Sequence, residues 1–128
     1  MLLFKFFNSY FKKKPFYLNN YGNYFRYFTY IKNVVQIVQK LIDIKLYRHK
    51  VCAVCSNKPV NIKKIISLFK KNHKVKVKNF KRYQVDILNT HGDNSKTKKT
   101  INYSKFITFN HTLIKTFTWY KSNKIFNY

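Results

Sequence analysis

The chain has 128 residues, enough for about one domain, and carries 27 Lys and Arg against 3 Asp and Glu, a formal net charge of +24. Three isolated acids, two glycines and the absence of G-x-x-x-x-G-K, G-x-G-x-x-G and G-x-S-x-G motifs disfavour an enzyme, so we expect no catalytic residue and no cofactor. A compact chain this basic is expected to bind a polyanion, and nucleic-acid phosphate is the natural partner.

Residues 1–30 mix aromatic side chains with Lys, Arg and Asn without a steady period of two or 3.6. This pattern predicts an extended basic-aromatic arm whose rings can stack on bases. The alternative, that the rings form a second hydrophobic layer of the domain, stays open. From Ile31 the apolar residues recur at helical spacing, which predicts an amphipathic helix over residues 31–46.

The apolar run Val51 to Cys55 predicts a short strand, and Pro59 marks its end and suits the first turn of a helix. The next helix is expected to bury one face, formed by Ile62, Ile65, Ile66 and Phe69. Strict alternation over HKVKVKNF then predicts a half-buried strand with a basic outer face.

A second alternating piece is expected from Tyr83 to Ile87, and residues 89–102 are predicted to form a polar, basic loop. SKFITF, residues 104–109, and LIKTFTWY, residues 113–120, are read as two returning strands. The expected fold is α+β: a split βαβ-type, mainly antiparallel sheet with helices on one face, plus the basic-aromatic N-terminal extension.

Cys52 and Cys55 form a C-x-x-C pair, which raises the question of a metal site. Structural zinc needs four ligands, and the four histidines, His49, His73, His91 and His111, stand at irregular distances. Residues three apart on a strand also point to opposite faces. We therefore expect reduced thiols and no metal, and leave open an intermolecular site completed by a neighbouring chain.

Residues with A/T-rich codons dominate the composition, which favours Lys over Arg and is typical of a small organellar genome. The expected location is the mitochondrial matrix, with the protein encoded in the organelle. Because no apolar run approaches the roughly 20 residues of a membrane-spanning helix, we expect no stable membrane insertion.

Over residues 50–119 the order KVCAVC, NIKKIISLF, VKVKNF, SKFITF and LIKTF resembles the large-subunit ribosomal protein family L-twenty-three. IDIKLYRHK stands where that family has an x-P-x-x-T-E-K segment, and residues 1–30 have no counterpart in it. The resemblance implies a structural protein that binds rRNA beside neighbouring ribosomal proteins, among them the L-twenty-nine protein. It places the rRNA contacts on eight residues: Lys76, Lys78, Lys81, Arg82, Lys96, Lys98, Lys99 and Lys105.

The predicted organisation is an extension over residues 1–30, a helix over 31–46, an α+β rRNA-binding domain over 47–120 and a basic tail over 121–128. Two other functions fit the same composition. One is another mitochondrial ribosomal protein, small-subunit or lineage-specific. The other is a protein that uses its aromatic-basic arm on a membrane surface.

Overall fold

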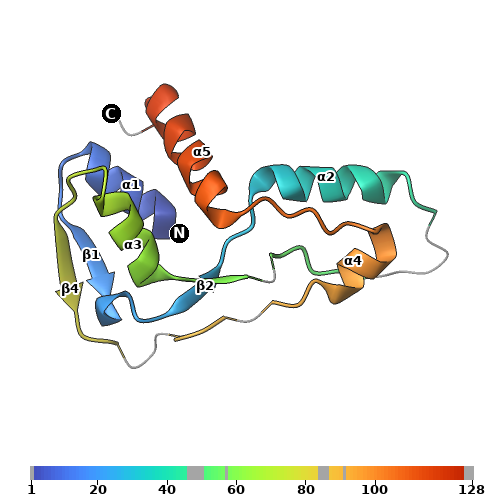
Figure 1. Cartoon of the computed structure of the whole chain (residues 1–128), viewed down its shortest axis with the longest axis horizontal. Coiled ribbons are helices and arrows are strands. Elements are labelled where there is room, and N and C mark those ends of the chain that lie inside the picture. Colours follow the sequence, from blue (N-terminus) through green and yellow to red (C-terminus); the bar gives the residue numbers. More distant parts are fainter. Residues whose placement is uncertain (1, 46–50, 57, 84–86, 91, 126–128) are drawn as a thin grey trace.

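The computed structural model describes residues 2–45, 51–56, 58–83, 87–90 and 92–125. In chain order the elements are α1 (Leu2–Phe11), β1 (Phe16–Asn19), the 3₁₀ turn η1 (Asn20–Gly22), β2 (Phe25–Tyr27), α2 (Ile31–Ile42), β3 (Pro59–Asn61), α3 (Ile62–Lys70), β4 (Val77–Phe80), α4 (Ser95–Ile101) and α5 (Phe109–Ser122). The molecule is elongated, with α1, α3, β1 and β4 at one end, α2 and α4 at the other, and β2 between them (Figure 1).

The described strands form two sheets of two strands each. β1 and β4 pair in parallel with Phe16 opposite Val77, and β2 and β3 pair antiparallel with Arg26 opposite Val60. The prediction of an α+β fold is therefore confirmed. The predicted single, mainly antiparallel sheet is wrong, because the segments expected to extend it do not pair in the described part of the chain.

The first hydrophobic core lies under α3. Ile62, Ile65, Ile66 and Phe69 are buried, as their helical spacing predicted, and they pack against α1, β1 and Leu113 of α5. The helix begins at Ile62, and Pro59, expected in its first turn, lies in β3 instead. The Asn61 side chain accepts a hydrogen bond from the Lys64 backbone N–H at 3.2 Å, a standard N-cap.

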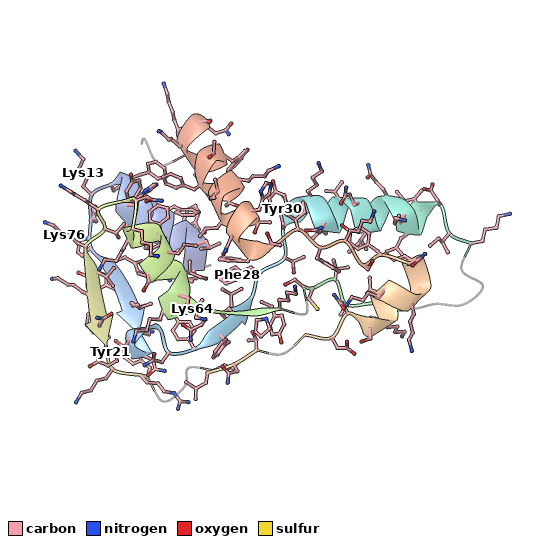
Figure 2. All side chains as sticks on the ribbon, in the orientation of Figure 1. Lys13, Tyr21, Phe28, Tyr30, Lys64 and Lys76 are labelled. Carbon is pink, nitrogen blue, oxygen red and sulfur yellow. The ribbon has the colours of Figure 1, made fainter. Side chains whose placement is uncertain are left out.

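Residues 1–30 are folded, so the prediction of an extended arm is wrong and the alternative of a second hydrophobic layer is correct. Leu2, Phe6 and Tyr10 recur every four residues, as do Leu3, Phe7 and Phe11, and this repeat puts both rows on one side of α1. Phe6 and Phe7 are fully buried. Phe28, labelled in Figure 2, packs its ring 5.0 Å from that of Phe109 at the start of α5.

The predictions for the last forty residues need correction. Residues 95–101 of the expected basic loop form α4, and the expected strand at 113–120 is the middle of α5. Phe109, Leu113, Phe117 and Tyr120 follow a helical period and pack on the first core, which outweighs the apparent alternation. Residues 104–108 are not paired, and the strand expected around 83–87 has its centre, residues 84–86, outside the described residues.

A second, smaller core joins α2 to α4. Ile37, Ile101 and Tyr103 are buried there, with Val54 packed against them. The buried Asn33 amide donates to the Tyr103 hydroxyl at 2.7 Å, which satisfies the polar group inside this core. The predicted helix is confirmed over residues 31–42. It ends at Ile42, with Asp43 as its C-cap, so the expected extension to residue 46 is wrong at least over residues 43–45.

Candidate functional site

A cleft of about 460 Å³ lies between β1, β2 and the residues Arg82, Ile87 and Leu88. We call it the arginine cleft, because Arg26 and Arg82 both line it. Lys5 adds a third cation, and the remaining walls combine aromatic rings with the amides of Asn19 and Asn20. Its volume falls in the range of small-molecule sites, about 300–1,000 Å³.

The guanidinium of Arg26 builds one wall of the arginine cleft. Its Nη1 donates to the carbonyl oxygens of Phe25 at 2.8 Å and Leu88 at 2.9 Å, and its Nη2 donates to that of Ile87 at 2.6 Å. The same group lies 4.8 Å from the centroid of the Tyr24 ring, a cation–π contact. Arg26 thereby ties β2 to a segment more than sixty positions later in the chain.

The distribution of arginine sets this cleft apart from the rest of the surface. The sequence has three arginines, Arg26, Arg48 and Arg82, among its 27 cationic residues, and two of them line this cleft. A guanidinium presents a planar fork of donors that binds a phosphate or carboxylate through two parallel hydrogen bonds, which an ammonium does not. In a chain whose composition favours Lys, two arginines in one cleft indicate a site for an anion.

The turn η1 sets the position of the amides at one end of the cleft. Asn20 and Tyr21 have φ of 46° and 52°, and Gly22 has φ of 76°. A Cβ on Gly22 would lie 3.1 Å from the backbone nitrogen of Lys63, so only glycine lets this turn pass so close to α3. The Asn20 side chain donates to the Asn23 carbonyl at 3.0 Å and is held at the edge of the cleft.

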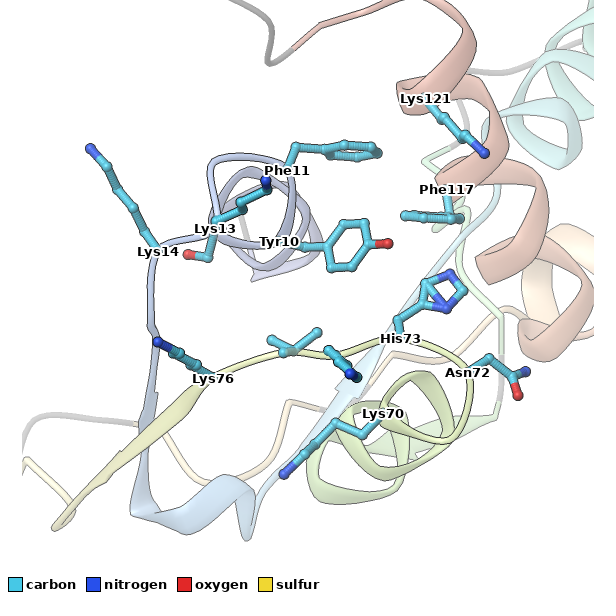
Figure 3. A pocket seen from close by; sticks show the side chains of 13 residues that line it. Tyr10, Phe11, Lys13, Lys14, Lys70, Asn72, His73, Lys76, Phe117 and Lys121 are labelled. Atoms are coloured by element: carbon cyan, nitrogen blue, oxygen red, sulfur yellow. The ribbon is translucent and has the colours of Figure 1, made fainter.

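A larger cavity of about 940 Å³ opens between the ends of α1, α3 and α5 (Figure 3). We call it the lysine cavity, since its lining carries six lysines: Lys13, Lys14, Lys70, Lys74, Lys76 and Lys121. Its aromatic floor is continuous with the first core, where the rings of Phe11 and Phe117 stack at 5.5 Å. Burial lowers the pKa of His73 in this lining, and the charge of Lys121 lowers it further.

The eight residues predicted to contact rRNA do not form one surface. Lys78 lies on β4, Lys81 follows that strand, and Lys76 lines the lysine cavity. Arg82 lines the arginine cleft. Lys96, Lys98 and Lys99 lie at the far end of the molecule, on α4. Lys105 lies near the start of α2, where its carbonyl accepts from the Asn33 amide at 3.3 Å. Figure 2 places Lys76 beside Lys13, at the end opposite α4.

Sequence reasoning identified Arg82 and missed Arg26, Tyr17 and the asparagines of the arginine cleft. The available signal was the rarity of arginine in this chain, which marks Arg26 as strongly as Arg82. The position of Tyr17, 56% exposed on β1 with its ring 5.4 Å from that of Phe80, follows from strand pairing and had no sequence signal.

The two cysteines are free thiols in the structure. Burial raises the pKa of the Cys55 thiol, the nearby carboxylate of Asp93 raises it further, and Lys98 opposes the rise. Within the described ranges, which omit His49 and His91, no three His, Cys, Asp or Glu side chains gather as a metal site would require. In the same ranges no helix is both long and apolar enough to cross a bilayer.

Comparison with known proteins shows what this fold resembles. No family model matches the sequence. An uncharacterised protein of Methanocaldococcus jannaschii is 32% identical over 126 residues, which is 97% of this chain and 38% of that protein. The chain thus spans about two fifths of the length of this curated relative.

Solved structures give a consistent likeness. UDP-glucuronic acid 4-epimerase from Bacillus cereus, solved with UDP-glucuronic acid and NAD, matches with a TM-score of 0.83 and 20% identity, over 95% of this chain and 40% of that one. UDP-N-acetylglucosamine 4-epimerase from Methanobrevibacter ruminantium, solved with UDP-N-acetylmuramic acid, matches with a TM-score of 0.82 and 18% identity, over 96% and 40%. The NAD-dependent NDP-hexosamine 5,6-dehydratase TunA matches with a TM-score of 0.81 and 19% identity, over 95% and 40%.

These likenesses overturn the ribosomal assignment. The prediction of an L-twenty-three protein, its rRNA and ribosomal-protein partners, the two alternative functions and the expectation that the protein is not an enzyme are all wrong. The chain has the fold of part of nucleotide-sugar epimerases and dehydratases. The resemblance misled because residues 51–55 and 104–108 belong to no strand in the described part of the chain, and LIKTF lies entirely within α5. The mitochondrial location is untested and stays a prediction.

The residues of this chain do not fit NAD, which two of these enzymes use. A dinucleotide site of the common type needs a parallel sheet and a G-x-G-x-x-G turn that lets the pyrophosphate approach the backbone. Gly22 and Gly92 are the two glycines of the sequence. In the described residues the parallel pairing consists of the β1 and β4 pair and one isolated bridge between Phe25 and Asn89. We therefore assign no NAD chemistry to the residues of this chain.

Proposed function

We propose that this chain is the nucleotide-sugar-binding part of a protein related to the epimerases and dehydratases whose fold it shares, and that the arginine cleft holds the ligand. The observation that carries the proposal is the pairing of Arg26 and Arg82 in one cleft of a chain that otherwise uses lysine. The likeness to proteins solved with UDP-sugars supports the choice of ligand class.

The lining matches the three parts of such a ligand. The Arg82 guanidinium and the Lys5 ammonium supply charge for the diphosphate. The exposed Tyr17 ring offers a face on which the base can stack. The amides of Asn19 and Asn20 can exchange hydrogen bonds with sugar hydroxyls.

We assign the cleft a role in binding and orientation. Its described lining contains no Asp, Glu, His or Cys side chain, so its lysine and tyrosines are the groups there that could transfer a proton. In this proposal Arg82 and Lys5 bind the diphosphate, while Arg26 holds the wall of the cleft through its bonds to backbone carbonyls.

Calorimetric titration of UDP-glucuronic acid into the purified chain tests the proposal. Arg82→Gln removes one charged donor, which is expected to weaken binding by about tenfold to a hundredfold. Arg82→Lys keeps the charge and loses the fork, so it should fall between wild type and Arg82→Gln. Lys76→Gln, an equal charge change in the lysine cavity, is the matched control and should stay within about twofold, the size of a screened surface effect.

An equal loss of affinity in Arg82→Gln and Lys76→Gln would show that the ligand senses net charge only and would refute the cleft as its site. Inorganic pyrophosphate and uridine, titrated separately, divide the affinity between the phosphates and the base. Binding of pyrophosphate as tightly as the UDP-sugar would show that Tyr17 makes no contribution.

A further inference from the structure

The lysine cavity concentrates positive charge where three helices end. Six of the 13 residues that line it are lysines, whereas the whole chain has 27 cationic residues among 128. All six are exposed, and the described lining contains no Asp or Glu. They come from three distant stretches of the sequence, 13–14, 70–76 and 121, which only the fold brings together (Figure 3). The concentration of charge is therefore a property of the fold and not of a local run of lysines.

The ends of the helices account for part of this charge. α1 ends at Phe11, α3 at Lys70 and α5 at Ser122, and the last turn of each helix contributes to the lining. Each helix C-terminus carries the equivalent of about half a negative charge, so the three together offset about one and a half of the six positive charges. About four and a half positive charges remain, and they repel one another unless an anion binds between them.

The backbone holds these cations at fixed places. The Lys14 backbone N–H donates to the Ser9 carbonyl at 2.9 Å, which closes the C-terminal turn of α1. Lys13 occupies the left-handed position of this turn, with φ of 51°. Just before β4, the Lys76 carbonyl accepts from the Phe16 backbone N–H at 2.8 Å. A ligand would meet cations whose main-chain positions are already set, so its binding would order little besides the lysine side chains.

The floor of the lysine cavity is aromatic and includes His73. The centroid of its ring lies 5.3, 4.2 and 4.8 Å from those of Tyr10, Phe69 and Phe117. Its Nδ1 atom is buried and has no hydrogen-bond partner in the described part of the chain. Burial and the charge of Lys121 lower the pKa of His73, so a negative charge bound in the cavity would raise this pKa again. His73 therefore reports on the occupancy of the cavity.

The cations of the two sites suit different anions. An ammonium is a compact point charge on a flexible stem, whereas a guanidinium is a rigid fork that fixes the orientation of one group. Several ammonium groups therefore suit a chain of phosphates in which every unit carries charge. A triphosphate carries about four negative charges near neutral pH, because the second pKa of its terminal phosphate is about 6. This charge matches what remains in the lysine cavity, whose volume of about 940 Å³ exceeds the 460 Å³ of the arginine cleft.

We propose that the lysine cavity binds an oligophosphate, a small molecule with a chain of three or more phosphates. In their described linings the lysine cavity and the arginine cleft share no residue, so the protein could hold one anion in each. The oligophosphate site goes beyond the nucleotide-sugar proposal and does not depend on it.

Calorimetric titration of inorganic tripolyphosphate into the purified chain tests this site. The titrations use the Arg82→Gln variant, so that the arginine cleft contributes little to the signal. We expect one tripolyphosphate per protein chain, and a rise in the pKa of His73, followed by NMR, when it binds. Pyrophosphate carries less charge and should bind more weakly by about fivefold, the size of one exposed ion pair.

Lys13→Gly removes one cation and places the residue that a left-handed turn favours at that position. The affinity for tripolyphosphate should fall by about fivefold, while the melting temperature of the free protein should not fall. Lys124→Gly is the matched control, because Lys124 is also left-handed, with φ of 48°, and does not line the cavity. It should change the affinity by less than about twofold, the size of a screened surface effect.

The oligophosphate site is wrong if tripolyphosphate does not bind, if several ions bind per chain, if Lys13→Gly and Lys124→Gly weaken binding equally, or if the pKa of His73 does not change on binding. A nucleoside triphosphate distinguishes the two sources of such a ligand. Affinity no greater than that of tripolyphosphate identifies an inorganic phosphate chain, and greater affinity identifies a nucleotide whose base stacks on the aromatic floor. Titrations of UDP-glucuronic acid into the wild-type chain report separately on the arginine cleft.

Discussion

Replacing Phe7 by Ala tests whether α1 belongs to the folded domain. Phe7 is fully buried, and its ring lies 5.8, 5.7, 5.5 and 5.6 Å from those of Phe6, Phe69, Phe117 and Tyr120. Truncation of a buried Phe to Ala costs about 3–5 kcal/mol, and four ring partners favour a value near the upper end. We expect a loss of about 4 kcal/mol, a large fraction of the roughly 5–15 kcal/mol that stabilises a domain.

Urea unfolding followed by circular dichroism measures this loss. For an m-value of about 2 kcal/mol/M, the midpoint should fall by about 2 M. Phe4→Ala is the control on the same helix, because Phe4 is 38% exposed and its ring lies 6.2 Å from that of Tyr120. We expect it to cost about 1 kcal/mol or less. If Phe7→Ala costs no more than Phe4→Ala, α1 does not pack on α3 and α5 in solution.

Two further predictions concern a turn and a titratable group. Gly22→Ala should destabilise the chain by about 1–3 kcal/mol, because φ is 76° at this position and the new Cβ would lie 3.1 Å from the Lys63 backbone nitrogen. An unchanged urea midpoint would mean that the turn is not held against α3. Burial lowers the pKa of His73 in the folded state, and the charge of Lys121 lowers it further. As the pH falls through the ordinary histidine pKa of about 6.5, the unfolded chain therefore takes up the proton before the folded chain does. The free energy of unfolding falls as a result. His73→Gln should flatten the dependence of the unfolding free energy on pH between about pH 7.5 and 5.5, whereas His111→Gln should keep the wild-type dependence. Equal slopes in the wild type and both variants would contradict the burial of His73.

The sequence by itself determined the elements whose information is local. The helical spacing from Ile31 and from Ile62 located α2 and α3. Composition predicted an anionic partner. The glycine count excluded a dinucleotide-binding turn within the chain. Each of these inferences needed only residues that are close together in the sequence, or the number of residues of one type.

Only the tertiary structure decided where an anion site forms and which secondary structure residues 51–55 and 113–120 adopt. The arginine cleft exists because Arg26 bonds to the carbonyls of Ile87 and Leu88, more than sixty positions away, and no local pattern reports such a contact. Apparent alternation at 113–120 became helix because Leu113 and Phe117 pack on the first core. The strand predicted at 51–55 is extended without a partner, because a strand needs a neighbouring edge that the described residues do not supply.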